Sequence, residues 1–306
     1  MYPVFARMAA LAGRRRRLHG RFAPAALLAA LLLAGSVPPA EAVVTIGSNL
    51  ARVPNSAAKY DPRPTFSNVS LAANRQAPGG LSSPVNGTVV RWRIRVGDST
   101  KVTNLRIIRP QGRGLFTGAG TSPSVTPPIH ATTSYDVQLP IQIGDYIGLD
   151  CCDPDFFEPD AEFFVAGNAA VRNEWQPGLA DGGPGHAPRS ASPYEIALNA
   201  EIEPTSTFSL DAITHNKKTG TATIAAKVPN PGELTGSGGG VKVASAAVTR
   251  KRVRAPGKVK LLIKAKGKKK RKLNSTGKVK VWPEITYTPI GGSASTQSMK
   301  VRLIKR

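Results

Sequence analysis

The sequence predicts an all-β protein built from two β-sandwich domains. Many short segments alternate apolar and polar side chains with period two, which is the pattern of half-buried strands. Glycine and proline are abundant, with 30 and 26 residues, and they supply the turns that join such strands. No segment after the first 42 residues keeps the 3.6-residue apolar period of a packed helix.

Residues 1–42 are predicted to be a cleaved signal peptide. Arg14–Arg17 and Arg21 precede an uncharged apolar run at 25–37, and Ala40-Glu41-Ala42 is a small-x-small cleavage site. The run is shorter than the roughly 20 residues that a membrane-spanning helix needs. We therefore expect a secreted or cell-surface protein with no transmembrane segment in the mature chain. A retained membrane anchor is the alternative.

The charge distribution divides the mature chain into two modules. Residues 206–306 hold 23 basic and three acidic residues, a net charge of +20, whereas residues 43–205 hold 13 basic and 15 acidic residues, a net charge of −2. Such an asymmetry predicts separate domains at 43–205 and 206–306. It also indicates that the second domain associates with polyanions.

The first domain is expected to be a jelly-roll-like sandwich, because antiparallel half-buried strands over this length need two facing sheets. We expect strands near 43–46, 69–72, 90–96, 102–109, 114–118, 132–139, 141–149, 161–167 and 194–202. Inward positions are Val90, Trp92, Ile94 and Val96 in one strand, and Tyr194, Ile196, Leu198, Ala200 and Ile202 in another. Outward positions are Arg91, Arg93 and Arg95, and Glu195, Asn199, Glu201 and Glu203. We interpret the arginine row as a solvated face paired with acidic neighbours, with an anion-binding face as the alternative.

The only two cysteines, Cys151 and Cys152, are adjacent. Neighbouring Cα atoms lie ~3.8 Å apart, which is closer than most disulfides allow. We favour a disulfide between them because exported proteins fold in an oxidising compartment. Free thiols and a bridge to a second chain are the alternatives.

Carboxylates crowd around the two cysteines. Hard oxygen ligands of this kind bind calcium, so Asp150, Asp153, Asp155, Glu158 and Asp160 form a candidate calcium site. The spacing matches no EF-hand loop. An acidic, solvated loop without an ion is the alternative, and we expect no other cofactor.

Residues 173–192 lack periodicity and are rich in turn formers. Long loops in compact domains are often functional. Trp175 in this loop could stack on a ligand, with carbohydrate as the class considered. It could equally cover an edge of the sandwich.

The second domain shows sharper alternation. We expect strands near 220–228, 232–235, 241–248, 258–266, 278–287 and 297–305. In 258–266, Val259, Leu261, Ile263 and Ala265 form one face, and Lys258, Lys260, Lys264 and Lys266 form the other. The strand number and length are those of an immunoglobulin-like sandwich, although the Cys…Trp…Cys signature is absent.

Basic residues peak at one place in this domain. Lys266, Lys268, Lys269, Lys270, Arg271 and Lys272 are flanked by Gly267 and Asn274, so we expect a polyanion-binding loop. Lysines that only keep strands soluble are the alternative. Few aromatic residues stand among these lysines and no nucleic-acid-binding motif occurs, so we expect no sequence-specific nucleic acid partner.

Several segments of the second domain share a family pattern: 216–222 (NKKTGTA), 228–234 (VPNPGEL), 240–242 (GVK), 273–278 (LNSTGK) and 287–292 (YTPIGG). In these segments residues 208–306 resemble a lysine-rich immunoglobulin-like repeat found at the C-terminal end of exported actinobacterial proteins. The first domain resembles, at 89–96 and 139–148, uncharacterised sandwich domains that precede this repeat. The resemblance implies no catalytic residues.

No catalytic motif is present: the sequence holds no G-x-S-x-G, no H-E-x-x-H and no P-loop. We therefore expect a non-enzymatic binding protein of the cell envelope or extracellular space. Its basic domain would associate with anionic envelope polymers or other extracellular polyanions, and its first sandwich would bind an unknown ligand. The alternative is a hydrolase of an envelope polymer that uses carboxylates of the 150–162 loop.

Overall fold

The computed structural model describes residues 43–58, 63–151, 161–167, 170–244 and 250–306. In these residues each sheet takes its strands either from 44–204 or from 209–304, and we call the two sets the first and the second sandwich. The predicted all-β, sandwich-type fold is confirmed. The boundary between 205 and 206, and the jelly-roll-like and immunoglobulin-like assignments, stay predictions. The signal peptide predicted over 1–42 lies outside the described residues.

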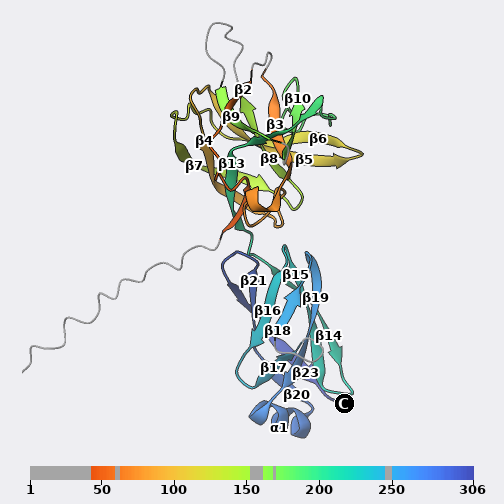
Figure 1. Ribbon diagram of the computed structural model, residues 1–306. Coiled ribbons are helices and arrows are strands. Elements are labelled where there is room, and N and C mark those ends of the chain that lie inside the picture. The colour runs from red at the N-terminus through yellow and green to blue at the C-terminus, as the bar shows by residue number, and fades with distance from the viewer. Residues whose placement is uncertain (1–42, 59–62, 152–160, 168–169, 245–249) are drawn as a thin grey trace, which may run out of the picture. The chain divides into compact units, whose positions relative to one another are not determined.

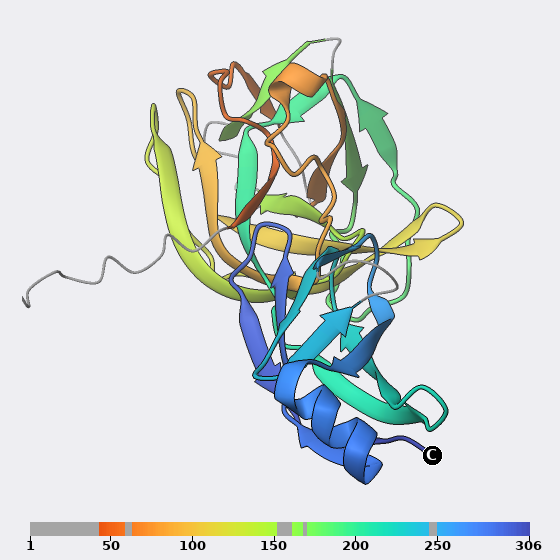
Figure 2. The same cartoon turned by 90° about the horizontal axis from the view of Figure 1, so that it is seen from below.

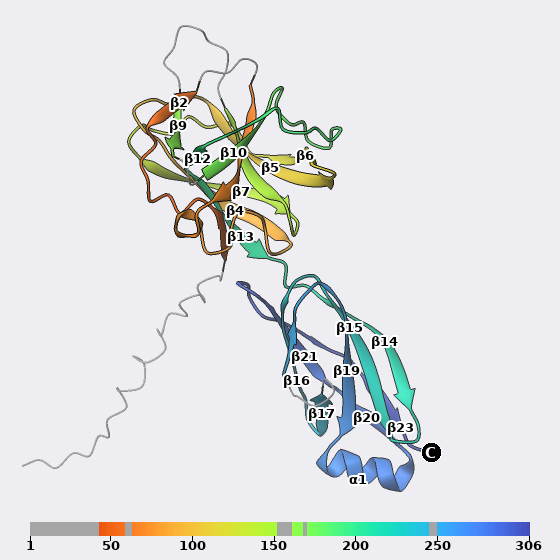
Figure 3. The same cartoon turned by 45° about the vertical axis from the view of Figure 1, so that its right-hand side comes forward.

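The first sandwich has three antiparallel sheets (Figure 1, Figure 3). Its strands are β1 (Val44–Gly47), β2 (Ser56–Ala58), β3 (Thr65–Leu71), β4 (Gly87–Arg95), β5 (Thr103–Gly112), β6 (Leu115–Thr121), β7 (Thr132–Ile141), β8 (Tyr146–Cys151), β9 (Ala161–Ala166), β10 (Ala170–Trp175), β11 (Ser190–Ser192), β12 (Tyr194–Ile196) and β13 (Leu198–Pro204). The sheet orders are β1-β13-β4-β7, β11-β10-β3-β8-β5-β6 and β12-β9-β2.

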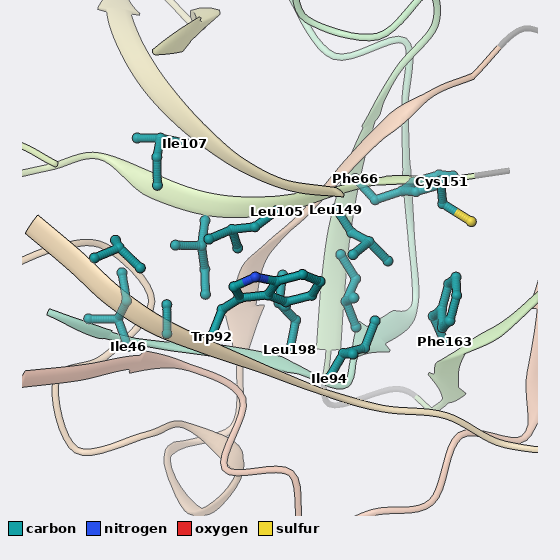
Figure 4. Packing of buried hydrophobic residues seen from close by; sticks show 14 of the residues in the cluster. Ile46, Phe66, Trp92, Ile94, Leu105, Ile107, Leu149, Cys151, Phe163 and Leu198 are labelled. Carbon is teal, nitrogen blue, oxygen red and sulfur yellow. The ribbon is translucent and has the colours of Figure 1, made fainter. Parts of the chain in front are cut away.

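The core of the first sandwich lies between the first two of these sheets. Trp92 of β4 and Leu198 of β13 face Leu105 of β5 and Leu149 of β8, as Figure 4 shows. The Trp92 ring is 1% exposed and lies 4.9 Å from the ring of Tyr135. Burying aromatic and branched side chains on both inner faces is the main stabilising term of such a sandwich.

The predicted inward position of Val90 is wrong. Val89 is fully buried whereas Val90 is only half-buried. The pairing of β4 with β7 shifts register between Val89 and Arg91, and this β-bulge turns the side chains before it to the other face. From Trp92 onward the predicted alternation holds.

Glu195 is likewise not outward as predicted, because it is 1% exposed. The Ser48 hydroxyl donates a 2.6 Å hydrogen bond to Glu195 Oε1, and Arg75 Nη1 lies 3.8 Å from Oε2. The expected strand 194–202 is in fact two strands, β12 and β13, in different sheets. Alternation therefore does not continue from one strand into the other.

The second sandwich is also antiparallel. Its strands are β14 (Ser209–Asn216), β15 (Thr221–Val228), β16 (Gly232–Ser237), β17 (Val241–Ala244), β18 (Arg250–Val253), β19 (Gly257–Ala265), β20 (Lys278–Val281), β21 (Glu284–Pro289), β22 (Ser295–Ser298) and β23 (Val301–Ile304), with the helix α1 (Gly267–Thr276) between β19 and β20. The sheet orders are β14-β15-β19-β17, β18-β16-β21-β22 and β20-β23. The inward faces of β15, β19, β20, β21 and β23 form one buried cluster. Within that cluster Tyr287 donates a 2.8 Å hydrogen bond to the Asn230 carbonyl, and burial raises the pKa of Tyr287 to about 12.

Two expected strands of this sandwich change sheets midway. The stretch 278–287 is β20, which pairs with β23, followed by β21, which pairs with β16 and β22. The change occurs at Trp282-Pro283, where proline removes a ladder hydrogen bond. The stretch 297–305 divides in the same way into β22 and β23. Strands that switch sheets at a corner are typical of packed sheets.

Candidate functional site

The basic cluster predicted as a loop forms the helix α1, so the loop prediction is wrong. Lysine and arginine are good helix formers, and Gly277 ends the helix in the left-handed conformation with φ 66°. One apolar side chain, Leu273, is 4% exposed and anchors the helix on the sandwich. The helix lies at one end of the second sandwich, beside β20 (Figure 1, Figure 2). The glycine after a run of helix formers was the signal in the sequence.

The basic side chains of α1 and its N-cap point to solvent. Lys266, Lys268, Lys270, Arg271 and Lys272 are exposed, and Lys269 is half-buried. Within the described part of the chain, none of these six residues is a partner in an ion pair. The described carboxylates therefore do not neutralise the charge of the helix.

Further basic residues lie at the C-terminal end of α1. Lys305 Nζ donates a 2.9 Å hydrogen bond to Asn274 Oδ1, and the Arg306 amide donates one to the Lys217 carbonyl. Lys217, in the turn between β14 and β15, is exposed, as are Lys305 and Arg306. The basic surface at this end of the sandwich thus draws on three segments that are far apart in the sequence.

Strand pairing also places basic residues directly opposite one another. Lys227 faces Lys258, Lys242 faces Lys264, and Lys280 faces Arg302. All six side chains are exposed. Like charges directly opposite on neighbouring strands repel and destabilise the sheet. The alternation in the sequence revealed the outward lysines, but not that they would be paired with each other.

Trp175, predicted to bind a ligand, is buried, so its ring offers no exposed platform. It is 1% exposed and packs edge-on against Phe116 at 5.2 Å between ring centres. Its Nε1 donates a 3.2 Å hydrogen bond to the His186 carbonyl. This bond and the pairing of Phe116 with His186 fix the following loop against β6. The alternative interpretation, that Trp175 covers an edge of the sandwich, agrees with these contacts.

The loop that follows Trp175 lines a pocket of about 570 Å³ next to β5 and β6. Its lining includes Arg109, Gln111, Thr117 and the glycines at 182, 183 and 185. Arg109 is already bound to Asp145 at 2.8 Å, and the Thr117 hydroxyl donates to the Gly183 carbonyl at 2.8 Å. Asp181, which pairs with Arg106 and is 44% exposed, and Leu115 also line the pocket, so it presents glycine backbone, the Gln111 amide and one carboxylate.

Of the predicted calcium ligands, only Asp150 lies in the described residues. Its carboxylate pairs with Arg106 and accepts a 2.6 Å hydrogen bond from Thr65 Oγ1. Burial raises the pKa of Asp150 despite the arginine. Asp153, Asp155, Glu158 and Asp160 lie outside the described residues. In the part that is described, no three His, Cys, Asp or Glu side chains are grouped as a metal site would require.

Cys151 is disulfide-bonded and 1% exposed, within the core that Figure 4 shows. Cys152 lies outside the described residues, so the predicted bond between the two stays a prediction.

Two of the three arginines in the β4 row are paired with carboxylates, which agrees with the interpretation as a paired, solvated face. Arg91 lies 3.0 Å from Asp136 and 3.2 Å from Glu201, and Arg93 pairs with the same glutamate. Arg95 donates to the carbonyls of Leu50 and Ala51. Arg91 and Arg93 thus differ from the basic residues of α1, none of which is in an ion pair within the described residues.

No protein-family model matches the chain, and no curated protein matches it. The resemblance of 208–306 to the lysine-rich repeat therefore stays a prediction. Among the described residues, no helix has the length and apolar character needed to cross a membrane.

Proposed function

We propose that this protein is an exported, non-catalytic binding protein of the cell envelope or extracellular space, and that its second sandwich associates with anionic polymers. The observation that carries the proposal is the set of exposed basic residues that face one another instead of facing carboxylates. Lys227–Lys258, Lys242–Lys264 and Lys280–Arg302 are such pairs, and α1 with its N-cap adds six more basic residues. If these lysines served only to keep the protein soluble, acidic residues opposite them would make the sheets more stable.

An anionic polymer lying on this surface relieves the repulsion and releases its own counterions, which drives binding. Lysine ammonium groups act as point charges and read no base edges. The second sandwich is therefore expected to select for charge density and not for nucleotide sequence. The export of the protein rests on residues 1–42 alone. The pocket beside β6 is the place in the first sandwich where its unknown ligand would bind.

The substitution Lys258→Glu tests the proposal through two opposite effects. A glutamate at this position attracts Lys227 where the lysine repels it, so the free energy of unfolding should rise by about 0.5 kcal/mol at low salt. The same change removes a positive charge and adds a negative one, so affinity for long-chain polyphosphate should fall about tenfold or more. Urea unfolding and a binding titration measure the two quantities.

Lys258→Gln is the matched control, with a smaller change in both directions. The gain in stability should shrink at high salt, because the pair is exposed and screened. A variant that is more stable but binds polyphosphate as tightly as the original protein would contradict a binding role for these paired lysines.

A further inference from the structure

One exposed aromatic ring stands within the basic surface. Trp282, between β20 and β21, is 49% exposed, whereas Phe208 and Tyr287 of the same sandwich are buried. Lys269 of α1 places its ammonium group 5.7 Å from the centre of the Trp282 ring. A lysine at this distance over an indole makes a cation–π contact, and about half of the Trp282 surface stays exposed.

The glycine-rich loop after β16 packs closely on both residues. A Cβ added to Gly240, whose φ is +75°, would lie 2.5 Å from Lys269 Cγ, and one added to Gly238, whose φ is +136°, would lie 2.6 Å from the Trp282 carbonyl oxygen. Only glycine fits these close approaches. The Lys266 amide also donates a 2.7 Å hydrogen bond to the Gly240 carbonyl, which ties α1 to the loop. The same loop therefore contacts both Lys269 and Trp282.

A carboxylate completes the set. Glu284 follows Trp282 by two residues, and both side chains are exposed. Pro283, which lies between them, and Ile285, which follows Glu284, are buried. Ser237, the strand partner of Glu284, donates a 3.2 Å hydrogen bond to its Oε2. An aromatic face, an ammonium donor and a carboxylate acceptor suit a ring that carries hydroxyl groups, because the carboxylate accepts from hydroxyls but repels phosphates.

We propose that Trp282, Lys269, Glu284 and Ser237 form a subsite for one sugar ring of an acidic polysaccharide. The acidic group of that ring would meet the Lys269 ammonium, and a ring hydroxyl would donate to Glu284. This inference rests on the proposed function and specifies its polymer. A flexible polyphosphate has no ring to stack on Trp282. Binding of single-stranded nucleic acid relies on several aromatic residues under successive bases, and the described part of the second sandwich exposes only Trp282 among its aromatic side chains.

Polygalacturonate, a uronic acid polymer, is the probe for the subsite. We expect Trp282→Ala to weaken its binding about tenfold, a typical effect of removing one stacking contact, and Trp282→Phe to restore part of the loss. Binding of inorganic polyphosphate should change less than about twofold, because the charges that attract it remain. The other two tryptophans, Trp92 and Trp175, are 1% exposed, so a change of fluorescence on addition of polygalacturonate reports on Trp282 itself.

The outcomes separate the subsite from the wider surface. If polyphosphate binds but Trp282→Ala leaves polygalacturonate affinity unchanged, the subsite is refuted and the basic surface stands. If the same variant weakens oligo-dT as much as polygalacturonate, the ring stacks on bases and the sugar assignment is wrong. Failure of the original protein to bind either polyphosphate or polygalacturonate at low salt would refute the proposed function itself.

Discussion

Changing Lys268, Lys269, Lys270 and Lys272 together to glutamine is expected to weaken polyphosphate binding by at least about 100-fold at low salt. Each ammonium group that contacts the polymer releases counterions, so the loss of four contacts multiplies. The side chains lie on a helix that Leu273 holds in place, and glutamine is nearly as good a helix former as lysine. The fold should therefore survive, and fluorescence-detected titration at fixed salt measures the loss.

The fourfold lysine-to-arginine variant is the matched control. It keeps every positive charge on α1 and should keep the affinity within a few fold, since arginine also binds phosphate. Circular dichroism before and after substitution checks that α1 and the strands persist. If the glutamine variant binds as tightly as the original protein, α1 is only a solubilising feature.

Replacing Arg106 with methionine is expected to destabilise the protein by about 3 kcal/mol at neutral pH, the usual cost of breaking a buried ion pair. Arg106 contacts both Asp150 and Asp181, and the side chains of Arg106 and Asp150 are 12% and 11% exposed. Without the guanidinium, the Asp150 carboxylate is left charged in a buried site. Urea unfolding measures the change.

The loss should depend on pH in a defined direction. Burial already raises the pKa of Asp150, and removing Arg106 raises it further, above the unfolded value near 3.9. The folded variant then binds a proton that the unfolded chain releases, so its stability is retained near pH 4 and lost as the pH rises through the folded pKa. The double variant Arg106→Met, Asp150→Asn should lose this pH dependence. Equal destabilisation at pH 4 and pH 7 would show that packing, not charge, causes it.

The sequence predicted the strands whose alternation is simple and missed features that depend on distant contacts. The alternation of β19 and of β4 after Trp92 is read directly from the apolar positions. The bulge at Val89 and the sheet changes at Ala197 and Trp282 depend on which strands become neighbours. Local patterning holds no such information.

In the candidate site, too, some features could be predicted from the local sequence and others depend on distant contacts. The basic composition of 266–272 was evident, but the helix was missed because its single apolar residue, Leu273, gives no periodicity. The paired lysines required the register between β15, β17 and β19. For Trp175 the sequence left ligand stacking and edge covering equally open, because its neighbours are turn formers while its burial comes from Phe116 on another strand.

The dependence of polyphosphate affinity on salt tests the central claim most directly. The logarithm of the association constant should fall linearly with the logarithm of salt concentration, and the six basic residues at 266–272 should contribute about −4 to the slope for a single-stranded polyanion, to which the paired basic residues of the strands add. The slope of the fourfold glutamine variant should be shallower than that of the original protein by about 3, because four contacts are lost. An affinity that does not change with salt would contradict a polyanion-binding role for the second sandwich, and a slope that is the same in both proteins would contradict such a role for α1.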